Sequence, residues 1–498
     1  MTKRIVSILL ILSALLSFTA CSGSSDENKP NNTSTTTAPT TTANPDIVYE
    51  EDDLPANLDF GEEEVVFLTP TGKEGSHWDG EITVEDLSSE VLNDSIYNRE
   101  RFVEDRLNVE ITNVAVEQSE YNQKVITQMT AYENTYQIYA ASTVWFASTA
   151  FDEGYLYDLY DLDYLDLEKP WWSQHFTEAA SFKDHLYLAT GSLSLSLTRF
   201  LFAIYYNKDL AADYAETIPE LENLYEIVES GKWTYDKFYS LGSGIYSDAN
   251  GNSISDEEDI FGIALNNGIA TDTIWSGFDL NIFSKDESGW FYLDVNQDKL
   301  YSCLDKMMQL LFNTTGCYVP VSHEDSALQE ISEKFASNSV LFMINKLHEA
   351  EGETLRNMQS DYGILPYPKY DENQKEYYSY AHDAYLSFAI PTTNPNPNIA
   401  TAVLEAMASY SYRHTEPAYL DLALKGKYMS DAYSRRMIDL VVDGFKLDSN
   451  WIYCMELGHF GSTFRDLLRS GSTSYATTYL GLEKTINTIL KVTGRDIT

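Results

Sequence analysis

The sequence predicts an α/β fold with a mostly parallel, doubly wound sheet. Apolar segments of strand length alternate with amphipathic segments of helix length. The folded body starts near Asn57 and runs to the C-terminus, which is too long for one ordinary domain and suits two large lobes. Ligands of such sheets bind beyond the carboxyl ends of the strands, so we expect functional residues there.

The first elements of the body form a predicted βαβαβ unit. Strands are predicted at residues 64–69, 109–114 and 136–141, where apolar and β-branched side chains gather. Helices are predicted at 94–108 and 120–131, where apolar residues recur at helical spacing. Three strands separated by two helices indicate parallel pairing.

The N-terminus has the layout of an export signal. A charged start precedes an apolar run at residues 5–18, and small residues lead to Cys21. This layout resembles a bacterial lipobox, with Phe18 where that pattern usually has Leu. It predicts a lipoprotein signal peptide at residues 1–20 and an acylated Cys21 that holds the protein on the outer face of a membrane. An ordinary secretory signal is the alternative, and both interpretations export the protein.

Residues 21–56 are expected to be a disordered tether. They are rich in Ser, Thr, Pro and Asn and carry few apolar side chains, so they bury too little surface to offset chain entropy. O-glycosylation of the Thr-rich tract is left open by the sequence.

The composition excludes several partners. The net charge is −44, which repels phosphate backbones and anionic lipid, so we expect no nucleic-acid partner. Aromatic residues make up 13% of the chain, with 36 Tyr and 8 Trp. This supply suits a wide cleft for sugars, which need flat rings surrounded by polar groups.

The chain carries no motif of a metal or nucleotide enzyme. CxxC, HExxH, P-loop and GxGxxG patterns are all missing from the sequence, so we expect no enzymatic activity and no required cofactor. Cys303, Cys317 and Cys454 form an odd set beside Cys21. We expect three buried thiols, with a Cys303–Cys317 bridge as the alternative.

Seven segments carry a family resemblance across nearly the whole body. In chain order they are NDSIYNRERFVEDRLNV from Asn93, FDEGYLYDL from Phe151, YYNKDL from Tyr205, GKWTYDKF from Gly231, FASNSVLFM from Phe335, YGILPYPKYDENQKEYYS from Tyr362 and FAIPTTNPN from Phe388. Their order and spacing resemble the extracellular solute-binding proteins of ABC importers, in the carbohydrate group that includes maltose-binding protein and Firmicutes lipoproteins.

The resemblance implies a two-lobe, periplasmic-binding-protein-like (Venus-flytrap) fold, with a hinge and a ligand clamped in the interlobe cleft. It also implies delivery of a carbohydrate, which we expect to be an oligosaccharide, to ABC permease subunits in the membrane, and we expect the protein to be a monomer. The expected division is 57–165 for the first part of lobe 1, 166–383 for lobe 2, 384–448 for the second part of lobe 1 and 449–498 for C-terminal helices returning to lobe 2.

Ligand-binding residues are expected where strands end near the cleft. Trp145 and Phe146 follow the strand at 136–141, and the resemblance implies an aromatic sugar platform in this loop; a core role for Trp145 is the alternative. The other candidates are Arg199, Trp275, His382, Asp383, Tyr385, Trp451 and Phe464. An arginine among so many acids is often simply paired, which is the alternative for Arg199.

The segment at residues 248–259, DANGNSISDEED, is a separate candidate calcium loop. Oxygen ligands are expected at Asp248, Asn250, Asn252, Ile254 (through its carbonyl), Asp256 and Asp259. The spacing resembles EF-hand loops, and the final Asp resembles the dockerin version. Ser253 stands where glycine is expected, and a hydrated acidic turn is the alternative.

Three functional classes remain open from the sequence. The first is a transport-associated sugar receptor. The second is a surface glycan-binding or sensory lipoprotein of the same fold without transport. The third is a secreted glycosidase that works through paired carboxylates, although acidic pairs are so common in this chain that they decide nothing. The ligand's identity is open, and a peptide is not excluded by the sequence.

Overall fold

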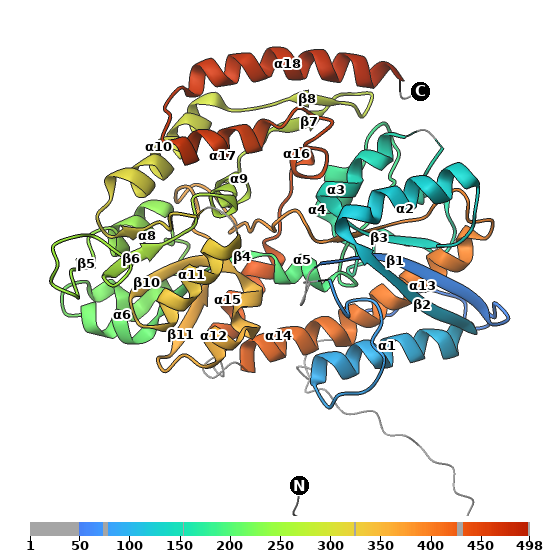
Figure 1. Cartoon of the computed structure of the whole chain (residues 1–498), viewed down its shortest axis with the longest axis horizontal. Helices are drawn as coiled ribbons and strands as arrows, with labels where there is room; N and C mark the ends of the chain where they lie inside the picture. The colour runs from blue at the N-terminus through green and yellow to red at the C-terminus, as the bar shows by residue number, and fades with distance from the viewer. Residues whose placement is uncertain (1–48, 73–77, 153, 323–324, 426–431, 497–498) are drawn as a thin grey trace, which may run out of the picture. The chain divides into compact units, whose positions relative to one another are not determined.

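The strands of the protein form two larger sheets and one two-stranded sheet (Figure 1). The structure is a computed structural model that describes residues 49–72, 78–152, 154–322, 325–425 and 432–496. The predicted signal peptide, acylated Cys21 and the tether as far as residue 48 lie outside the described residues. Within the described ranges, every helix is too short or too polar to cross a bilayer.

The first sheet contains the predicted βαβαβ unit, which is confirmed with small shifts at its ends. The elements are β1 (Glu63–Thr71), α1 (Val91–Leu107), β2 (Val109–Glu117), α2 (Gln118–Ala131) and β3 (Ile138–Ser142). β1 pairs in parallel with both β2 and β3, and Figure 1 shows α1 and α2 on either side of these strands. Asn108 ends α1 in the left-handed conformation (φ 51°), which turns the chain directly into β2.

A fourth strand, β12 (Leu386–Ala389), joins this sheet from far along the chain. It pairs antiparallel with β3, giving the order β12-β3-β1-β2. The predicted sheet is therefore parallel in three strands only. The antiparallel direction follows because β12 enters after a crossing from the second sheet rather than through a βαβ connection.

The second sheet is mixed in direction. Its order is β11-β4-β10-β6-β5, with β9 beside β6. The bounds are β4 (Phe202–Asn207), β5 (Tyr246–Ser247), β6 (Ile260–Ala264), β9 (Cys317–Tyr318), β10 (Val340–Lys346) and β11 (Tyr362–Leu365). All seven residues of β10 are buried, as expected for a central strand. A separate hairpin consists of β7 (Phe283–Lys285) and β8 (Phe291–Leu293).

Helices cover both sheets and complete the C-terminal part. The remaining α-helices are α3 (Thr143–Phe146), α4 (Gln174–Ala180), α5 (Leu195–Arg199), α6 (Lys208–Tyr214), α7 (Leu224–Glu229), α8 (Tyr235–Gly242), α9 (Thr273–Gly277), α10 (Gln297–Asn313), α11 (Asp325–Ala336), α12 (Glu353–Arg356), α13 (Pro397–Tyr410), α14 (Glu416–Lys425), α15 (Ala432–Asp443), α16 (Ser449–Ile452), α17 (Phe460–Ser470) and α18 (Tyr475–Asp496). Asn207 caps α6 by accepting the N–H of Leu210 at 3.0 Å, so β4 passes directly into a helix.

Three segments cross between the two sheets side by side. Ala189 exchanges backbone hydrogen bonds with Phe388, and Phe202 N–H donates to the Tyr380 carbonyl at 2.9 Å. Ser379 N–H donates to the Gly444 carbonyl at 2.7 Å. The sheets share one continuous apolar core and belong to one compact unit, Ala43–Thr498. The residue boundaries of the two lobes stay a prediction.

The three cysteines of the body are all free thiols. Cys303 and Cys454 are buried, which raises the pKa of each thiol to about 12. Cys317 is only partly buried, so the expectation of three buried thiols is met for two of them. The alternative Cys303–Cys317 bridge is not formed.

Candidate functional site

Two of the predicted site segments meet at the carboxyl end of β3. α3 begins there, and its first residues bond to the strand that enters β12: Val144 N–H donates to the Asp383 carbonyl at 3.1 Å, and Thr143 N–H donates to the Tyr385 carbonyl at 2.9 Å. The Thr143 hydroxyl donates to the same Tyr385 carbonyl at 2.9 Å. These bonds place the start of α3, which carries Trp145, against the segment that carries His382 and Asp383.

Trp145 and Phe146 are neighbours with opposite surroundings. The Trp145 residue is 49% exposed, whereas Phe146 is 1% exposed and packs edge-on against Tyr121 and Tyr139. The core role considered for Trp145 therefore falls to Phe146 instead. A further indole lies close by, because Trp78 Nε1 donates to the Ala384 carbonyl at 2.8 Å.

A buried ion pair supplies the charge of this site. Arg465 in α17 contacts Asp272 at the end of η4 (Ile269–Asp272) through two nitrogens, at 2.5 Å and 3.1 Å. Asp272 is fully buried, and the Arg465 guanidinium also lies over the Trp451 ring at 5.8 Å. A bidentate guanidinium–carboxylate contact fixes both groups, so this pair is a rigid feature of the site.

Burial and the charge of Arg465 act in opposite directions on two carboxyl groups. Burial raises the pKa of Asp272 to about 7 and that of Asp383 to about 6, while Arg465 opposes both shifts. Burial lowers the pKa of Arg465, but the charges of Asp272, Tyr380 and Asp383 and the hydrogen bond to Asp272 together raise it above its usual value. The charge of Arg465 therefore favours the ionised form of both Asp272 and Asp383. His382 is adjacent, with Nε2 at 3.5 Å from Asp383 Oδ1.

Two more acids, Glu456 and Asp152, contribute negative charge near this group. Burial raises the pKa of Glu456, and the charge of Asp152 raises it further. After burial, the charges of Asp383 and Glu456 raise the pKa of the Cys454 thiol, and the charge of Arg465 lowers it. The site therefore combines several carboxyl groups with one arginine and an exposed indole, a set that favours ligands with many hydroxyls over anions.

Four predicted aromatic side chains lie behind this surface in packed clusters. Trp275 contacts Trp451 and Phe464 at ring-centroid distances of 6.4 and 6.2 Å. Tyr385 packs against Phe176 at 6.1 Å. Trp275, Trp451, Phe464 and Tyr385 are each at most 2% exposed. The fold brings three of these rings together from distant segments, and they form the wall that supports the site rather than its open face.

Arg199 forms the pair that the sequence left as an alternative. Its Nε and Nη2 donate to the two carboxylate oxygens of Glu351 at 3.0 and 3.2 Å, and its guanidinium lies over the Tyr419 ring at 5.4 Å. One edge and one face of the guanidinium are thus engaged within the protein. Sequence reasoning missed Arg465 and Asp272, although Arg465 directly follows the candidate Phe464.

The candidate calcium loop adopts a tight turn. The Asp248 carboxylate accepts the N–H groups of Gly251, Asn252 and Ser253 at 2.7–3.2 Å, and Ser253 takes the left-handed conformation (φ 60°) expected of glycine at this position. Buried Asp259 accepts the Ala249 N–H at 3.1 Å. The departure at Ser253 therefore does not prevent the turn.

The predicted ligand set of this loop has three carboxylates, Asp248, Asp256 and Asp259, and two side-chain amides. Asn250 and Asn252 donate to Asp256 at 3.2 and 2.6 Å, so these predicted ligands lie together. Over the described ranges, three or more His, Cys, Asp or Glu side chains nowhere gather closely enough to hold a metal ion. Calcium binding by this loop stays a prediction.

Comparison with known proteins identifies a family. A family model of bacterial extracellular solute-binding proteins matches residues 99–412. A search of curated proteins found no significant match.

Solved structures share the fold at low sequence identity. The sugar-binding protein MalE of Xanthomonas citri superimposes with a TM-score of 0.55 and 9% identity, covering 86% of this chain and 97% of that one. The GacH receptor of Streptomyces glaucescens gives 0.53 and 14%, covering 86% and 99%. A cyclo/maltodextrin-binding protein gives 0.52 and 12%, covering 88% and 98%. At these identities the similarity shows the fold alone.

Proposed function

The chain belongs to the bacterial extracellular solute-binding proteins, and we propose that its solute is a neutral carbohydrate, captured between the two lobes. The observation that carries this proposal is that the half-exposed Trp145 follows Val144, which is bonded to the Asp383 carbonyl, while the Asp272–Arg465 pair acts electrostatically on the Asp383 carboxyl group. An indole face packs on the C–H face of a sugar ring, and the partly exposed Asp383 carboxylate and Arg465 guanidinium bond its hydroxyls, while buried Asp272 holds Arg465 in place.

The structural neighbours support this ligand class. The GacH receptor was solved with acarbose and an acarbose homolog, and the cyclo/maltodextrin-binding protein was solved with maltotetraose. A solute-binding protein of Thermotoga lettingae, with a TM-score of 0.51, was solved with α-D-tagatose. Their ligands differ in length, so the oligosaccharide length of this chain's ligand is a matter for experiment.

The proposed role is delivery of the sugar to ABC permease subunits by a monomer that is held on the outer face of the membrane through Cys21. The export signal in the sequence supports the location, and the family supports a binding role rather than an enzymatic one. A surface glycan-binding role or a sensory role would use the same site. Loss of sugar uptake on deletion of the gene would distinguish transport from these two roles.

Titration of the mature protein with a glycan panel tests the ligand class. Calorimetry with neutral oligosaccharides, anionic oligosaccharides and short peptides should give heat with neutral sugars, because the carboxyl-rich site repels anions. Mass analysis of each sugar afterwards should show unchanged glycan. Binding of peptides alone would refute the carbohydrate assignment, and cleaved glycans at enzyme-like rates would refute the binding role.

A further inference from the structure

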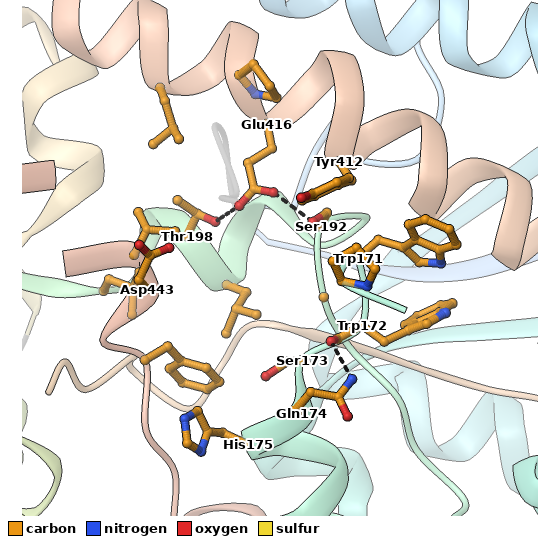
Figure 2. A pocket seen from close by; sticks show the side chains of 18 of the residues that line it. Trp171, Trp172, Ser173, Gln174, His175, Ser192, Thr198, Tyr412, Glu416 and Asp443 are labelled. Carbon is orange, nitrogen blue, oxygen red and sulfur yellow. Dashed lines mark hydrogen bonds between the residues drawn. The ribbon is translucent and has the colours of Figure 1, made fainter. Parts of the chain in front are cut away.

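A cavity of about 430 Å³ has a lining that differs from that of the candidate sugar site, and Figure 2 shows side chains that line it. Its walls come from residues 170–175, from the crossing segment at 191–201 and from α14 and the end of α15. It shares no lining residue with the group formed by Trp145, Asp272, Asp383 and Arg465. A volume of several hundred cubic ångströms is in the range of small-molecule sites, about 300–1,000 Å³.

The carboxylate of Glu416 is held in the roof of this cavity by neutral donors. The Ser192 and Thr198 hydroxyls donate to its two oxygens at 2.7 and 3.3 Å, and Figure 2 shows the side chain reaching from α14 toward them. Hydroxyl donors orient a carboxylate and leave its charge in place. Burial raises the pKa of Glu416, and the charge of Asp443 raises it further.

Two more acids on α15 line the same cavity. Asp439 and Asp443 have raised pKa values, by burial first and, for Asp439, by the charge of Asp443. Asp443 is exposed, so it stands at the open side, and Figure 2 places it across the space from Tyr412. Carboxylates that face one space repel each other, and a cation between them removes that repulsion.

The cavity walls supply no compensating cation. Its described lining residues include neither lysine nor arginine, and partial burial holds the pKa of His175 below its usual range, so the imidazole is neutral at pH 7. Nearby cations have other partners: Lys169 binds Glu50 and Asp53, and Arg413 binds Glu51. The exposed Arg435 and Arg436 lie outside the cavity lining; both act on Asp439, and Arg436 also acts on Asp443.

Aromatic and aliphatic side chains complete the walls. Tyr49 and Tyr412 meet edge to face with ring centroids 5.4 Å apart. Leu197, Leu201 and Phe445 contribute apolar surface. An alkyl chain is favourable against such walls, and tyrosine faces attract a cationic head group.

We propose that this cavity binds a protonated alkylamine, with its ammonium group at Glu416 and Asp443 and its alkyl part against the aromatic and leucine side chains. The combination disfavours two other classes of ligand. An anion meets three carboxyl groups with no lysine or arginine among the described lining residues, and a neutral polyol brings no charge to offset the repulsion between Glu416 and Asp443. The proposal is independent of the identity of the sugar.

Calorimetric titration of the mature protein with 1,4-diaminobutane tests the proposal, with 1,4-butanediol as the matched neutral probe. At a physiological ionic strength of about 0.15 M, the diamine should bind and the diol should not. Glu416→Gln keeps an acceptor for Ser192 and removes the charge, so the diamine affinity should fall about tenfold or more. Asp443→Asn should also lower the diamine affinity. Because Asp443 is exposed, this second variant tests the cavity without a substitution in the core.

Glu287→Gln is the control for general attraction of cations to an acidic chain. Glu287 is exposed in the turn between β7 and β8, outside the cavity lining, so its loss should leave the diamine affinity unchanged. Trp145→Ala should also leave diamine binding intact, which separates this cavity from the sugar site. Equal binding of diol and diamine, no binding to the folded wild-type protein, or equal losses in Glu287→Gln and Glu416→Gln would each overturn the proposal.

Discussion

Replacement of Trp145 by alanine is the most direct test of the proposed sugar site. Because the residue is 49% exposed beside Asp383, removal of its ring takes away the apolar platform while the polar groups stay. Truncation of a central aromatic anchor commonly costs about 2 kcal/mol or more of binding free energy, which is roughly a thirtyfold loss of affinity. We expect that loss for the best ligand found in the glycan panel.

The stability cost of the same change should be modest. Truncation of a fully buried Trp or Phe to alanine costs about 3–5 kcal/mol of unfolding free energy. Only about half of Trp145 is buried, so roughly 2 kcal/mol is expected. The bond from Asn122 Nδ2 to the Trp145 carbonyl, at 2.9 Å, involves the main chain and survives the substitution.

The assay pairs calorimetric titration with a thermal melt for each variant. Tyr292→Ala is the matched control, because Tyr292 is a 44% exposed aromatic residue on β8, outside the candidate site. A near-native melt with much weaker binding in Trp145→Ala alone would support stacking. Unchanged affinity in a folded Trp145→Ala protein, or an equal loss in Tyr292→Ala, would remove Trp145 from the site.

Three further predictions address the anchor, the calcium loop and the pH dependence. Cys21→Ser should release the protein into the medium, because each buried acyl CH₂ contributes about 0.8 kcal/mol of membrane affinity; equal membrane retention on cell fractionation would contradict acylation. Calcium should raise the melting temperature by binding the folded state, and Asp248→Ala with Asp259→Ala should abolish that rise; an unchanged rise would exclude this loop. Burial raises the pKa of Glu81 to about 8, against the charges of Arg199 and Arg99, so the folded state keeps a proton that the unfolded state loses above about pH 4.5. The unfolding free energy should therefore fall as pH rises from about 4.5 to 8, by at most about 1.4 kcal/mol per pH unit from this group. Denaturant titrations at pH 5 and pH 8 should show a smaller difference in unfolding free energy for Glu81→Gln than for the wild-type protein. Equal differences in the two proteins would contradict this role of Glu81.

Local periodicity was sufficient to predict three of the four strands of the first sheet. Each element from β1 to β3 has an apolar pattern of its own and follows its neighbour directly, so the prediction needed no distant contact. β12 could be placed only through the family resemblance, because its partner β3 lies far earlier in the chain. The mixed direction of the second sheet has the same cause, since β4 and β11 pair across long connections.

The charged part of the site had no local signal. Asp272 and Arg465 are 193 residues apart, and their pairing depends on the packing of α17 against η4. Residue type also fails to predict exposure for aromatic side chains. Trp145 and Phe146 are adjacent and similar in character, yet one is half-exposed and the other buried, because a helical turn of four residues points successive side chains in different directions.

Arg465 limits the effect of burial on the pKa values of two carboxyl groups in the proposed site. Burial raises the pKa of Asp272 to about 7 and of Asp383 to about 6 although Arg465 opposes both shifts, so without that guanidinium both groups would be protonated more readily near neutral pH. A protonated carboxyl loses acceptor capacity for sugar hydroxyls. Arg465 thus favours the ionised form of the partly exposed Asp383, which can accept hydrogen bonds. Its contact with Asp272 offsets much of its own charge, so little attraction is left for an anionic ligand. The proposed selectivity for neutral, hydroxyl-rich solutes therefore depends on this local balance as well as on the net charge of −44.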